Sequence, residues 1–150
     1  MFQHFDAVAA AVPEFPIYLY NNPGVGNSNT LSLGLITRLV EARPNIIGIK
    51  DSSGSLVSLV RLADRYPGNF NTASGGDGMI LMGVVSGIDA FFSGHANLVP
   101  ELVVGLYRQA ATGDLSVARA LQQQLNRVRD LLEDGLNLSL FKAMLACRGL

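Results

Sequence analysis

The stretch from residue 45 to residue 54, Asn-Ile-Ile-Gly-Ile-Lys-Asp-Ser-Ser-Gly, decides the fold class, because an apolar run there ends abruptly in polar residues and glycine. The run is short and rich in isoleucine, and Pro44 precedes it, so it predicts a buried strand over Asn45–Lys50. Further short runs, apolar or with strand-forming residues and bounded by proline, glycine or asparagine, predict three more strands: Pro16–Tyr20, Phe70–Ser74 and Ala90–Ser93.

Helical patterns occupy the gaps between these strands and continue after the last one. The predicted helices are Phe5–Val12, Thr30–Ala42, Ser55–Tyr66, a short helix over Asp77–Val85 capped by its aspartate, Glu101–Ala111 and Leu138–Cys147. Another helix starts at Asp114 and ends at Gly135, with a packing stripe of Ala118, Leu121, Leu125, Val128 and Leu132. Strands that alternate with helices indicate a parallel sheet, and we expect βα units to about residue 112 and C-terminal helices over about 114–148.

Composition narrows the class of protein further. A chain of 150 residues with 49% hydrophobic and 15% charged residues is expected to fold as one domain over residues 1–150. A net charge of −1 argues against a nucleic-acid partner. We find no apolar stretch of about 20 residues and no secretory signal, so we expect neither a membrane span nor export. The single cysteine, Cys147, suits the reducing cytoplasm.

The residues at the carboxyl ends of the predicted strands are the candidates for chemistry, because functional groups gather there in parallel βα folds. Each strand ends in polar or glycine residues: Tyr20-Asn21-Asn22-Pro23, Lys50-Asp51-Ser52-Ser53-Gly54, Ser74-Gly75-Gly76-Asp77 and Ser93-Gly94-His95. We therefore expect these four segments to form the floor of a site.

Lys50 is the sharpest of these candidates. It ends the apolar run Ile46–Ile49, and low-dielectric surroundings favour the neutral amine that condenses with a carbonyl to form a Schiff base. The alternatives are that it reaches the rim of the sheet or pairs with Asp51. Tyr20 ends the preceding strand and its phenol can relay protons, although a tyrosine held in the core fits the spacing equally well.

Glycines and histidines give weaker signals. Gly75-Gly76 can offer backbone amides to a carboxylate or phosphate, but a tight turn explains the pair as well. His95 lies near the expected site, whereas His4 falls on a predicted surface helix. Neither histidine has a partner at metal-ligand spacing, and we recognise no phosphate-binding loop and no Ser-His-Asp arrangement.

Taken together, the four segments resemble the dihydrodipicolinate synthase / N-acetylneuraminate lyase family of class I, Schiff-base-forming aldolases. The matching segments, in the order and spacing of the family, are Tyr20-Asn21-Asn22-Pro23, Gly48-Ile49-Lys50-Asp51-Ser52-Ser53-Gly54, Ser74-Gly75-Gly76-Asp77 and Gly87–Asn97 followed by Pro100-Glu101. The similarity runs along essentially the whole chain.

The resemblance implies a (β/α)8 barrel with extra C-terminal helices, pyruvate or a related 2-oxo acid as substrate, and no metal or organic cofactor. Lys50 matches the Schiff-base lysine of the family and Tyr20 its proton-relay tyrosine. Gly75 and Phe92 match backbone positions beside the bound 2-oxo acid, and we expect Asn21 and Ser74 to bind substrate as well. We also expect a homo-oligomer.

The sequence departs from the family in two ways. Only four strands are predicted, so we expect a half barrel equivalent to strands five to eight, without the Gly-Thr-Thr-Gly-Glu segment that grips the substrate carboxylate and with impaired turnover. In the segment Gly24–Asn27, Val25 replaces an arginine that is usual in the synthases. A 2-keto-3-deoxy sugar-acid aldolase or a dehydratase therefore fits at least as well as dihydrodipicolinate synthase.

Two other classes of function stay open on the sequence. One is a phosphate-binding barrel isomerase or synthase that uses the Gly75 and Gly94 loops. The other is a non-catalytic chain that associates through its edge strands or through the helix face from Leu121 to Leu132.

Overall fold

The computed structural model describes residues 1–25, 29–132 and 137–150. The described residues form two compact units. The first comprises Met1–Gly75 and Gly87–Ala90, and the second comprises Gly76–Ser86 and Phe91–Leu150. That residues 1–150 form one domain stays a prediction, because two compact units can belong to one domain or to two.

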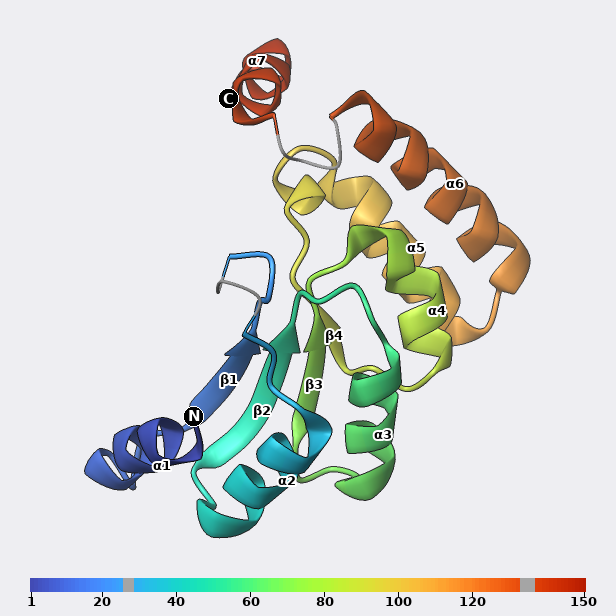
Figure 1. Cartoon of the computed structure of the whole chain (residues 1–150). Coiled ribbons are helices and arrows are strands. Elements are labelled where there is room, and N and C mark those ends of the chain that lie inside the picture. The colour runs from blue at the N-terminus through green and yellow to red at the C-terminus, as the bar shows by residue number, and fades with distance from the viewer. Residues whose placement is uncertain (26–28, 133–136) are drawn as a thin grey trace. The chain divides into compact units, whose positions relative to one another are not determined.

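The first unit is built on a parallel sheet, as predicted (Figure 1). The strands are β1 (Ile17–Asn21), β2 (Ile46–Asp51), β3 (Asn71–Ser74) and β4 (Ala90–Phe91), in the order β1-β2-β3-β4. Strand β2 pairs in parallel with both β1 and β3. The predicted ends of the first three strands agree within one residue, whereas β4 is two residues shorter than predicted.

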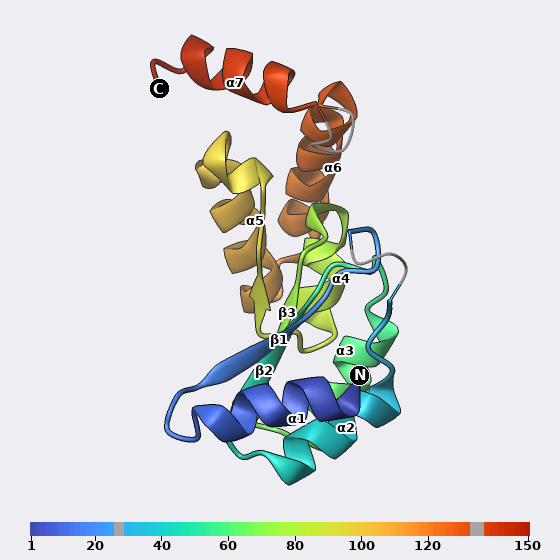
Figure 2. The same cartoon turned by 60° about the vertical axis from the view of Figure 1, so that its left-hand side comes forward.

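Three helices accompany this sheet: α1 (Phe2–Ala11), α2 (Leu33–Ala42) and α3 (Val57–Arg65). Helix α2 packs on β2 and α3 packs on β3, and α1 lies beside α2 (Figure 2). Their buried faces meet the buried residues of the strands in one apolar core, which includes Leu19, Ile36, Leu39, Ile49, Leu59 and Leu62. A continuous apolar run in β2 and apolar side chains that recur at helical spacing in α2 and α3 explain why these segments adopt these structures.

Polar contacts hold α1 against the start of the sheet. The Asn45 amide donates to the carbonyl oxygens of Ala9, Val12 and Phe15, at 3.1, 3.0 and 3.2 Å. Arg43, just after α2, contacts Asp6 of α1 at 2.6 Å, and the hydrogen bond from this guanidinium lowers the pKa of the Asp6 carboxyl. The chain therefore enters β1 at a position fixed by the residues that precede β2.

The second unit is helical. It contains the short 3-10 helices η1 (Asp77–Met79) and η2 (His95–Asn97) and the helices α4 (Ile80–Val85), α5 (Pro100–Thr112), α6 (Leu115–Leu131) and α7 (Leu138–Cys147). Helix α5 ends where Gly113 adopts a left-handed backbone with φ of +86°, and Asp114 caps α6 by accepting from Val117 N. Core residues include Ile80, Leu106 and Leu125. All five residues of the predicted stripe of α6 are buried or half-buried.

Two details of the second unit differ from the sequence prediction. The single helix predicted over Asp77–Val85 is divided into η1 and α4. Asp77 is not its cap, since Gly76 precedes η1 and the Asp77 carboxylate bonds His95 instead. The predicted helix break at Gly135 lies outside the described residues. No helix in the described part of the chain is both long and apolar enough to cross a membrane.

Candidate active site

The carboxyl ends of β1 and β2 bring Lys50 and Tyr20 together. The two residues are direct neighbours across the parallel pair, so their side chains leave the sheet on the same face. The Lys50 Nζ atom lies 3.3 Å from the Tyr20 hydroxyl oxygen and 4.3 Å from the centroid of the Tyr20 ring. A primary amine and a phenol thus lie within hydrogen-bond reach of each other. The amine can add to a carbonyl, and the phenol can transfer protons.

Three donors surround the Tyr20 oxygen. The Asn22 amide donates at 2.9 Å, Lys50 at 3.3 Å and the Ser52 hydroxyl at 3.5 Å. The hydrogen bond from Ser52 and, after it, the hydrogen bond and charge of Lys50 lower the pKa of Tyr20 against the opposing effect of partial burial. The phenol is therefore easier to deprotonate than an ordinary tyrosine.

The surroundings of Lys50 are only partly as the sequence predicts. Ile49, which precedes it, is fully buried, and so is Ala73, its neighbour on β3. Lys50 itself is half-buried, and Tyr20 is 49% exposed. The apolar strand bodies therefore flank the amine, while its own face of the sheet stays accessible to a substrate.

The next residue on each strand faces the opposite way. Asn21 and Asp51 are 3% and 4% exposed, and the Asn21 amide donates to the Asp51 carboxylate at 2.6 Å. The side-chain oxygen of Asn21 accepts from Leu31 N, and Asp51 also accepts from Ser53 through both its backbone and its hydroxyl. The structure does not bring the Asn21 side chain, expected to bind substrate, to the face of Lys50.

The other expected substrate contacts lie in three different settings. Ser74 is buried and pairs with Asp51 across the sheet, on the face away from Lys50. Gly75 follows it, and its N–H donates to the Asp51 carbonyl at 2.7 Å, so this amide is not available to an anion. Phe92 lies in the second unit, just after β4, with 55% of its surface exposed.

Two further residues of this site, Asn22 and Ser52, have no predicted role, although both lie in the segments quoted from the sequence. Each follows a candidate by two positions: Asn22 follows Tyr20, and Ser52 follows Lys50. Residues two apart on a strand share a face, so this period continued past the strand end is the signal that identifies them. Both donate to the Tyr20 oxygen.

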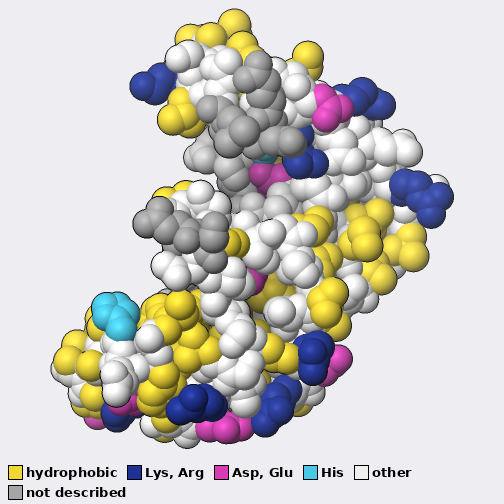
Figure 3. Space-filling view, viewed as in Figure 1, with side chains coloured by type: hydrophobic (Ala, Val, Ile, Leu, Met, Phe, Trp, Pro, Cys, Tyr) yellow, Lys and Arg dark blue, Asp and Glu magenta, His cyan; other side chains and the backbone are white. Residues whose placement is uncertain are grey.

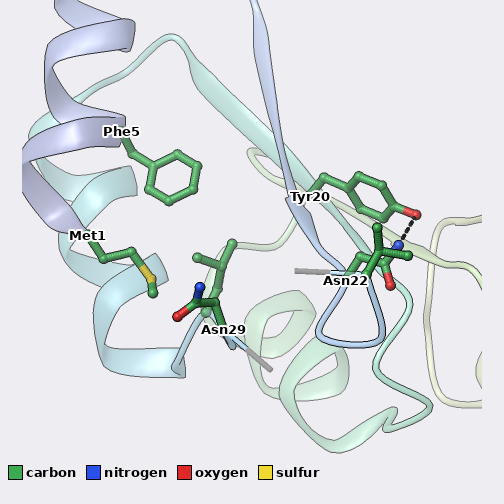
Figure 4. Close-up of a pocket in the computed structure, with 7 residues that line it drawn as sticks. Met1, Phe5, Tyr20, Asn22 and Asn29 are labelled. Carbon is green, nitrogen blue, oxygen red and sulfur yellow. Dashed lines mark hydrogen bonds between the residues drawn. The ribbon is translucent and has the colours of Figure 1, made fainter. Parts of the chain in front are cut away.

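A cavity of about 380 Å³ opens beside Tyr20 (Figure 4). Its described lining is mostly apolar and consists of Met1, Phe5, Tyr20, Asn22, Val25, Asn29 and Leu31. In Figure 4 the Tyr20 hydroxyl meets the Asn22 amide, while Met1 and Phe5 approach from the side of α1. Tyr20 therefore both contacts Lys50 and forms part of the wall of a pocket.

The two histidines lie elsewhere. His95 is buried in the second unit, and its Nδ1 atom lies 2.6 Å from the Asp77 carboxylate. His4 is exposed on α1. Among the described residues no group of three His, Cys, Asp or Glu side chains is arranged to hold a metal ion.

Parallel strands joined by helices, with the candidate side chains at the strand ends, place the chain among the (β/α)8 barrels, of which it forms about half. The chain belongs to the dihydrodipicolinate synthetase family, whose model matches residues 1–150. This match confirms the family that the four sequence segments resemble.

Relatives and solved structures agree with this membership. The chain is 37% identical over 147 residues to a DapA-like lyase of Halobacterium salinarum, covering 98% of this chain and 47% of the relative. It also resembles the solved structure of the 4-hydroxy-tetrahydrodipicolinate synthase from Methylacidiphilum fumariolicum, with a TM-score of 0.85, 34% identity, 99% of this chain and 49% of that one.

A second solved structure is that of the dihydrodipicolinate synthase from Acinetobacter baumannii complexed with pyruvate. It matches with a TM-score of 0.76 and 33% identity, covering 87% of this chain and 44% of that one. The chain thus spans about half the length of the relatives that it matches.

Proposed function

We propose that the protein acts on pyruvate or another 2-oxo acid as a lyase or aldolase that forms a Schiff base on Lys50. The observation that carries the proposal is the Lys50 amine, 3.3 Å from the Tyr20 hydroxyl at the ends of two neighbouring parallel strands. Membership of the dihydrodipicolinate synthetase family supports it, and so does the pyruvate with which the similar Acinetobacter synthase is complexed.

The geometry supports the following sequence of steps. The neutral Lys50 amine adds to the ketone carbon of the 2-oxo acid and gives a carbinolamine. The carbinolamine takes up a proton at its hydroxyl and loses water, which leaves a protonated imine between Nζ and the former ketone carbon. This cation accepts the electron pair of a neighbouring C–H or C–C bond as that bond breaks, and returns it when a new bond forms.

Tyr20 is the group proposed to move the protons in these steps. Its hydroxyl is within hydrogen-bond reach of Nζ, where the proton is lost and the carbinolamine forms. Its lowered pKa, caused first by the Ser52 hydrogen bond, brings its proton affinity closer to the working pH. A phenol that both accepts and returns a proton is useful when formation and hydrolysis of the imine share one site.

The second substrate is proposed from the pocket beside Tyr20. Val25, at the position where the synthases usually carry an arginine, lines this pocket and is 81% exposed. In the described part of the wall, the side chains of Met1, Phe5, Val25 and Leu31 offer no cation to a second carboxylate. A 2-keto-3-deoxy sugar acid, cleaved or dehydrated, therefore suits the described residues at least as well as the substrates of dihydrodipicolinate synthase.

We further propose that the protein works as a homo-oligomer in the cytoplasm, with a small 2-oxo acid and no nucleic acid as its partner. Hydrophobic side chains gather on the surface of the first unit over α1 and β1 (Figure 3). Phe15, just before β1, and Tyr18, on β1, are 68% and 46% exposed. A second copy that pairs with this surface would cover it, and sedimentation at micromolar concentration tests the expectation, since a monomeric mass contradicts it.

Reduction with borohydride in the presence of pyruvate tests the Schiff base directly. Mass mapping is expected to locate the adduct on Lys50, and Lys50→Arg is expected to abolish it, because a guanidinium keeps the charge but stays protonated. The reaction is run with the chain alone and with the chain co-expressed with the N-terminal half of a relative. An adduct on Lys142, or none under either condition, contradicts the proposal and favours a non-catalytic, associating protein.

A further inference from the structure

Ser52 and Gly75 lie so close together that a side chain at position 75 would overlap the Ser52 hydroxyl. A Cβ atom added at Gly75 would lie 2.3 Å from the Ser52 Oγ atom and 3.2 Å from the Ser52 Cβ atom. The first distance is far below any contact between real atoms, so a side chain at Gly75 requires the Ser52 hydroxyl to move. The φ angle of Gly75 is not in the left-handed region, so backbone conformation does not require glycine at this position.

The same hydroxyl approaches the reacting groups. Ser52 directly follows β2, and its Oγ atom lies 3.5 Å from the Tyr20 oxygen. Its backbone N–H donates to the Asn21 carbonyl at 2.8 Å, and Gly75 N–H donates to the Asp51 carbonyl at 2.7 Å. Both backbones are therefore tied to the sheet, which places the Ser52 side chain beside Gly75 and the Tyr20 phenol.

We propose that Ser52 is a positioning residue that holds the Tyr20 phenol ready to accept a proton, and that position 75 is glycine to leave room for the Ser52 hydroxyl. The inference rests on the proposed Schiff-base function. It assigns a role to Ser52, and it gives Gly75 a role other than the substrate contact expected from the sequence.

The number of donors explains the direction of the effect. A neutral phenol oxygen has two lone pairs, whereas three donors, from Asn22, Lys50 and Ser52, approach the oxygen of Tyr20. All three can donate at once only when the phenol has lost its proton. The arrangement therefore favours the phenolate, and removal of one donor is expected to weaken that preference.

Few charged groups face Tyr20 in the described part of the first unit. Lys50 from β2 contacts both its oxygen and its ring, while Asn22 and Ser52 are neutral. Met1, the residue before α1, lines the neighbouring pocket with an uncharged side chain. Asp51 points to the opposite face, where Asn21 and Ser53 bond it. A change at Ser52 therefore alters a hydrogen bond to the phenol without altering a nearby charge.

The proposal is tested by an NMR pH titration of Tyr20 in the full chain, labelled with 13C at the tyrosine Cζ atoms. The signal of Tyr20 is assigned as the one that Tyr20→Phe removes. Ser52→Ala is expected to raise the pKa of Tyr20 toward the ordinary value of 10.0, because the largest lowering contact is lost. Gly75→Ala is expected to raise it in the same direction, since it displaces the same hydroxyl. Ser55→Ala, which removes an exposed loop hydroxyl three residues further on, is the matched control and is expected to leave the titration unchanged.

The double variant S52A/G75A separates the steric effect from general damage. Without the Ser52 hydroxyl, the nearest remaining neighbour of the new Cβ atom is the Cβ atom of residue 52, at 3.2 Å, so the second substitution adds no further change to the Tyr20 titration. Thermal unfolding is expected at a lower temperature for G75A than for S52A/G75A. Should G75A fail to fold, the comparison of S52A with S55A still decides the proposal.

The experiment distinguishes this inference from the proposed function. Where pyruvate is trapped on Lys50, Ser52→Ala is expected to reduce kcat by roughly tenfold with little change in KM. If pyruvate is trapped and Ser52→Ala leaves both the Tyr20 titration and kcat unchanged, the positioning role is wrong. If no pyruvate is trapped yet the Tyr20 pKa rises in S52A, the contact is supported and the Schiff-base function is overturned.

Discussion

The two faces of the β1–β2 pair carry adjacent polar residues with different roles. On one face, Tyr20 is half exposed and Lys50 half-buried, and their side chains meet at the surface. On the other face, Asn21 and Asp51, one position further along each strand, are 3% and 4% exposed and bond each other. Both pairs join the same strands in the same register.

A polar residue at a strand end is therefore not by itself a site residue. The buried pair satisfies backbone and side-chain donors and so fixes where the strands end. Tyr20 and Lys50, one residue earlier on each strand, are positioned by the same strand ends, and their phenol and amine stay accessible. Substitutions in the buried pair, Asn21 and Asp51, should therefore cost stability, whereas substitutions in the exposed pair, Tyr20 and Lys50, should cost chemistry.

The greatest loss is expected on the buried face. Asp51→Asn places an amide donor where the carboxylate accepts from Asn21 at 2.6 Å and from Ser53 N at 2.7 Å, so at least one buried donor loses its partner. We expect the free energy of unfolding to fall by about 2–4 kcal/mol. Urea unfolding monitored by circular dichroism measures it.

Lys50→Arg is the matched control for this loss. It changes the neighbouring residue on the accessible face and is expected to alter the free energy of unfolding by less than about 0.5 kcal/mol while abolishing the proposed imine. Equal losses of stability in the two variants would contradict the division between the faces.

A smaller effect is expected where the accessible face is tightly packed. A Cβ atom added at Gly48 would lie 2.4 Å from the Cε1 atom of Tyr18 and 2.8 Å from the backbone oxygen of Asn71. The aromatic ring can move, but the backbone of β3 cannot move without disturbing the sheet. Gly48→Ala is therefore expected to lower the free energy of unfolding by about 1–3 kcal/mol.

Gly34→Ala provides the comparison for this variant. Gly34 lies in α2, and a Cβ atom there would meet no described atom within 4 Å. Alanine is expected to stabilise the helix by less than about 1 kcal/mol. If Gly48→Ala proved as harmless as Gly34→Ala, the accessible face would be looser than the geometry indicates.

Local patterns in the sequence predict most of the fold. They do not predict which polar residues at the strand ends lie on the accessible face and which lie on the buried face. The run that ends at Lys50 predicts β2 because its apolar residues are continuous and bounded by proline and glycine. Asp114 and Gly113 mark a helix boundary by their own backbone chemistry. Asp77 has the same local signature as a cap, but its carboxylate binds His95, 18 residues away, and no local rule contains that contact.

In the candidate site, too, local sequence patterns do not predict every contact. The sequence predicts Lys50 and Tyr20 as neighbours, and they are, since parallel strands bring their carboxyl ends to one edge. Asn21 is grouped with them by its position next to Tyr20, although alternation of side chains along a strand turns it to the other face. The contact between Ser52 and Gly75 depends on the approach of two loops and has no signature in either segment alone.

The smallest effect is expected in how the contribution of Tyr20 to the free energy of unfolding depends on pH. The hydrogen bonds from Ser52 and Lys50 lower the pKa of Tyr20 in the folded chain below its ordinary value of 10.0, so the unfolded chain binds more protons between the two values. The contribution of Tyr20 to the free energy of unfolding must then rise with pH across that interval, stay constant above 10.0 and be lost as the pH falls through the folded value. Because the phenol is half exposed, solvent screens the interaction and keeps the change small.

Urea unfolding of the natural chain and of Tyr20→Phe at several alkaline pH values measures this contribution as a difference. Tyr18→Phe removes another phenol from the same strand and face and shows how much of the change belongs to the loss of any such group. Ser52→Ala should reduce the rise for Tyr20, because the donor that contributes most to the lowering is absent. A difference between the natural chain and Tyr20→Phe that falls with rising pH would mean that the donors around the oxygen favour the neutral phenol, and the two faces would then not differ in the way proposed.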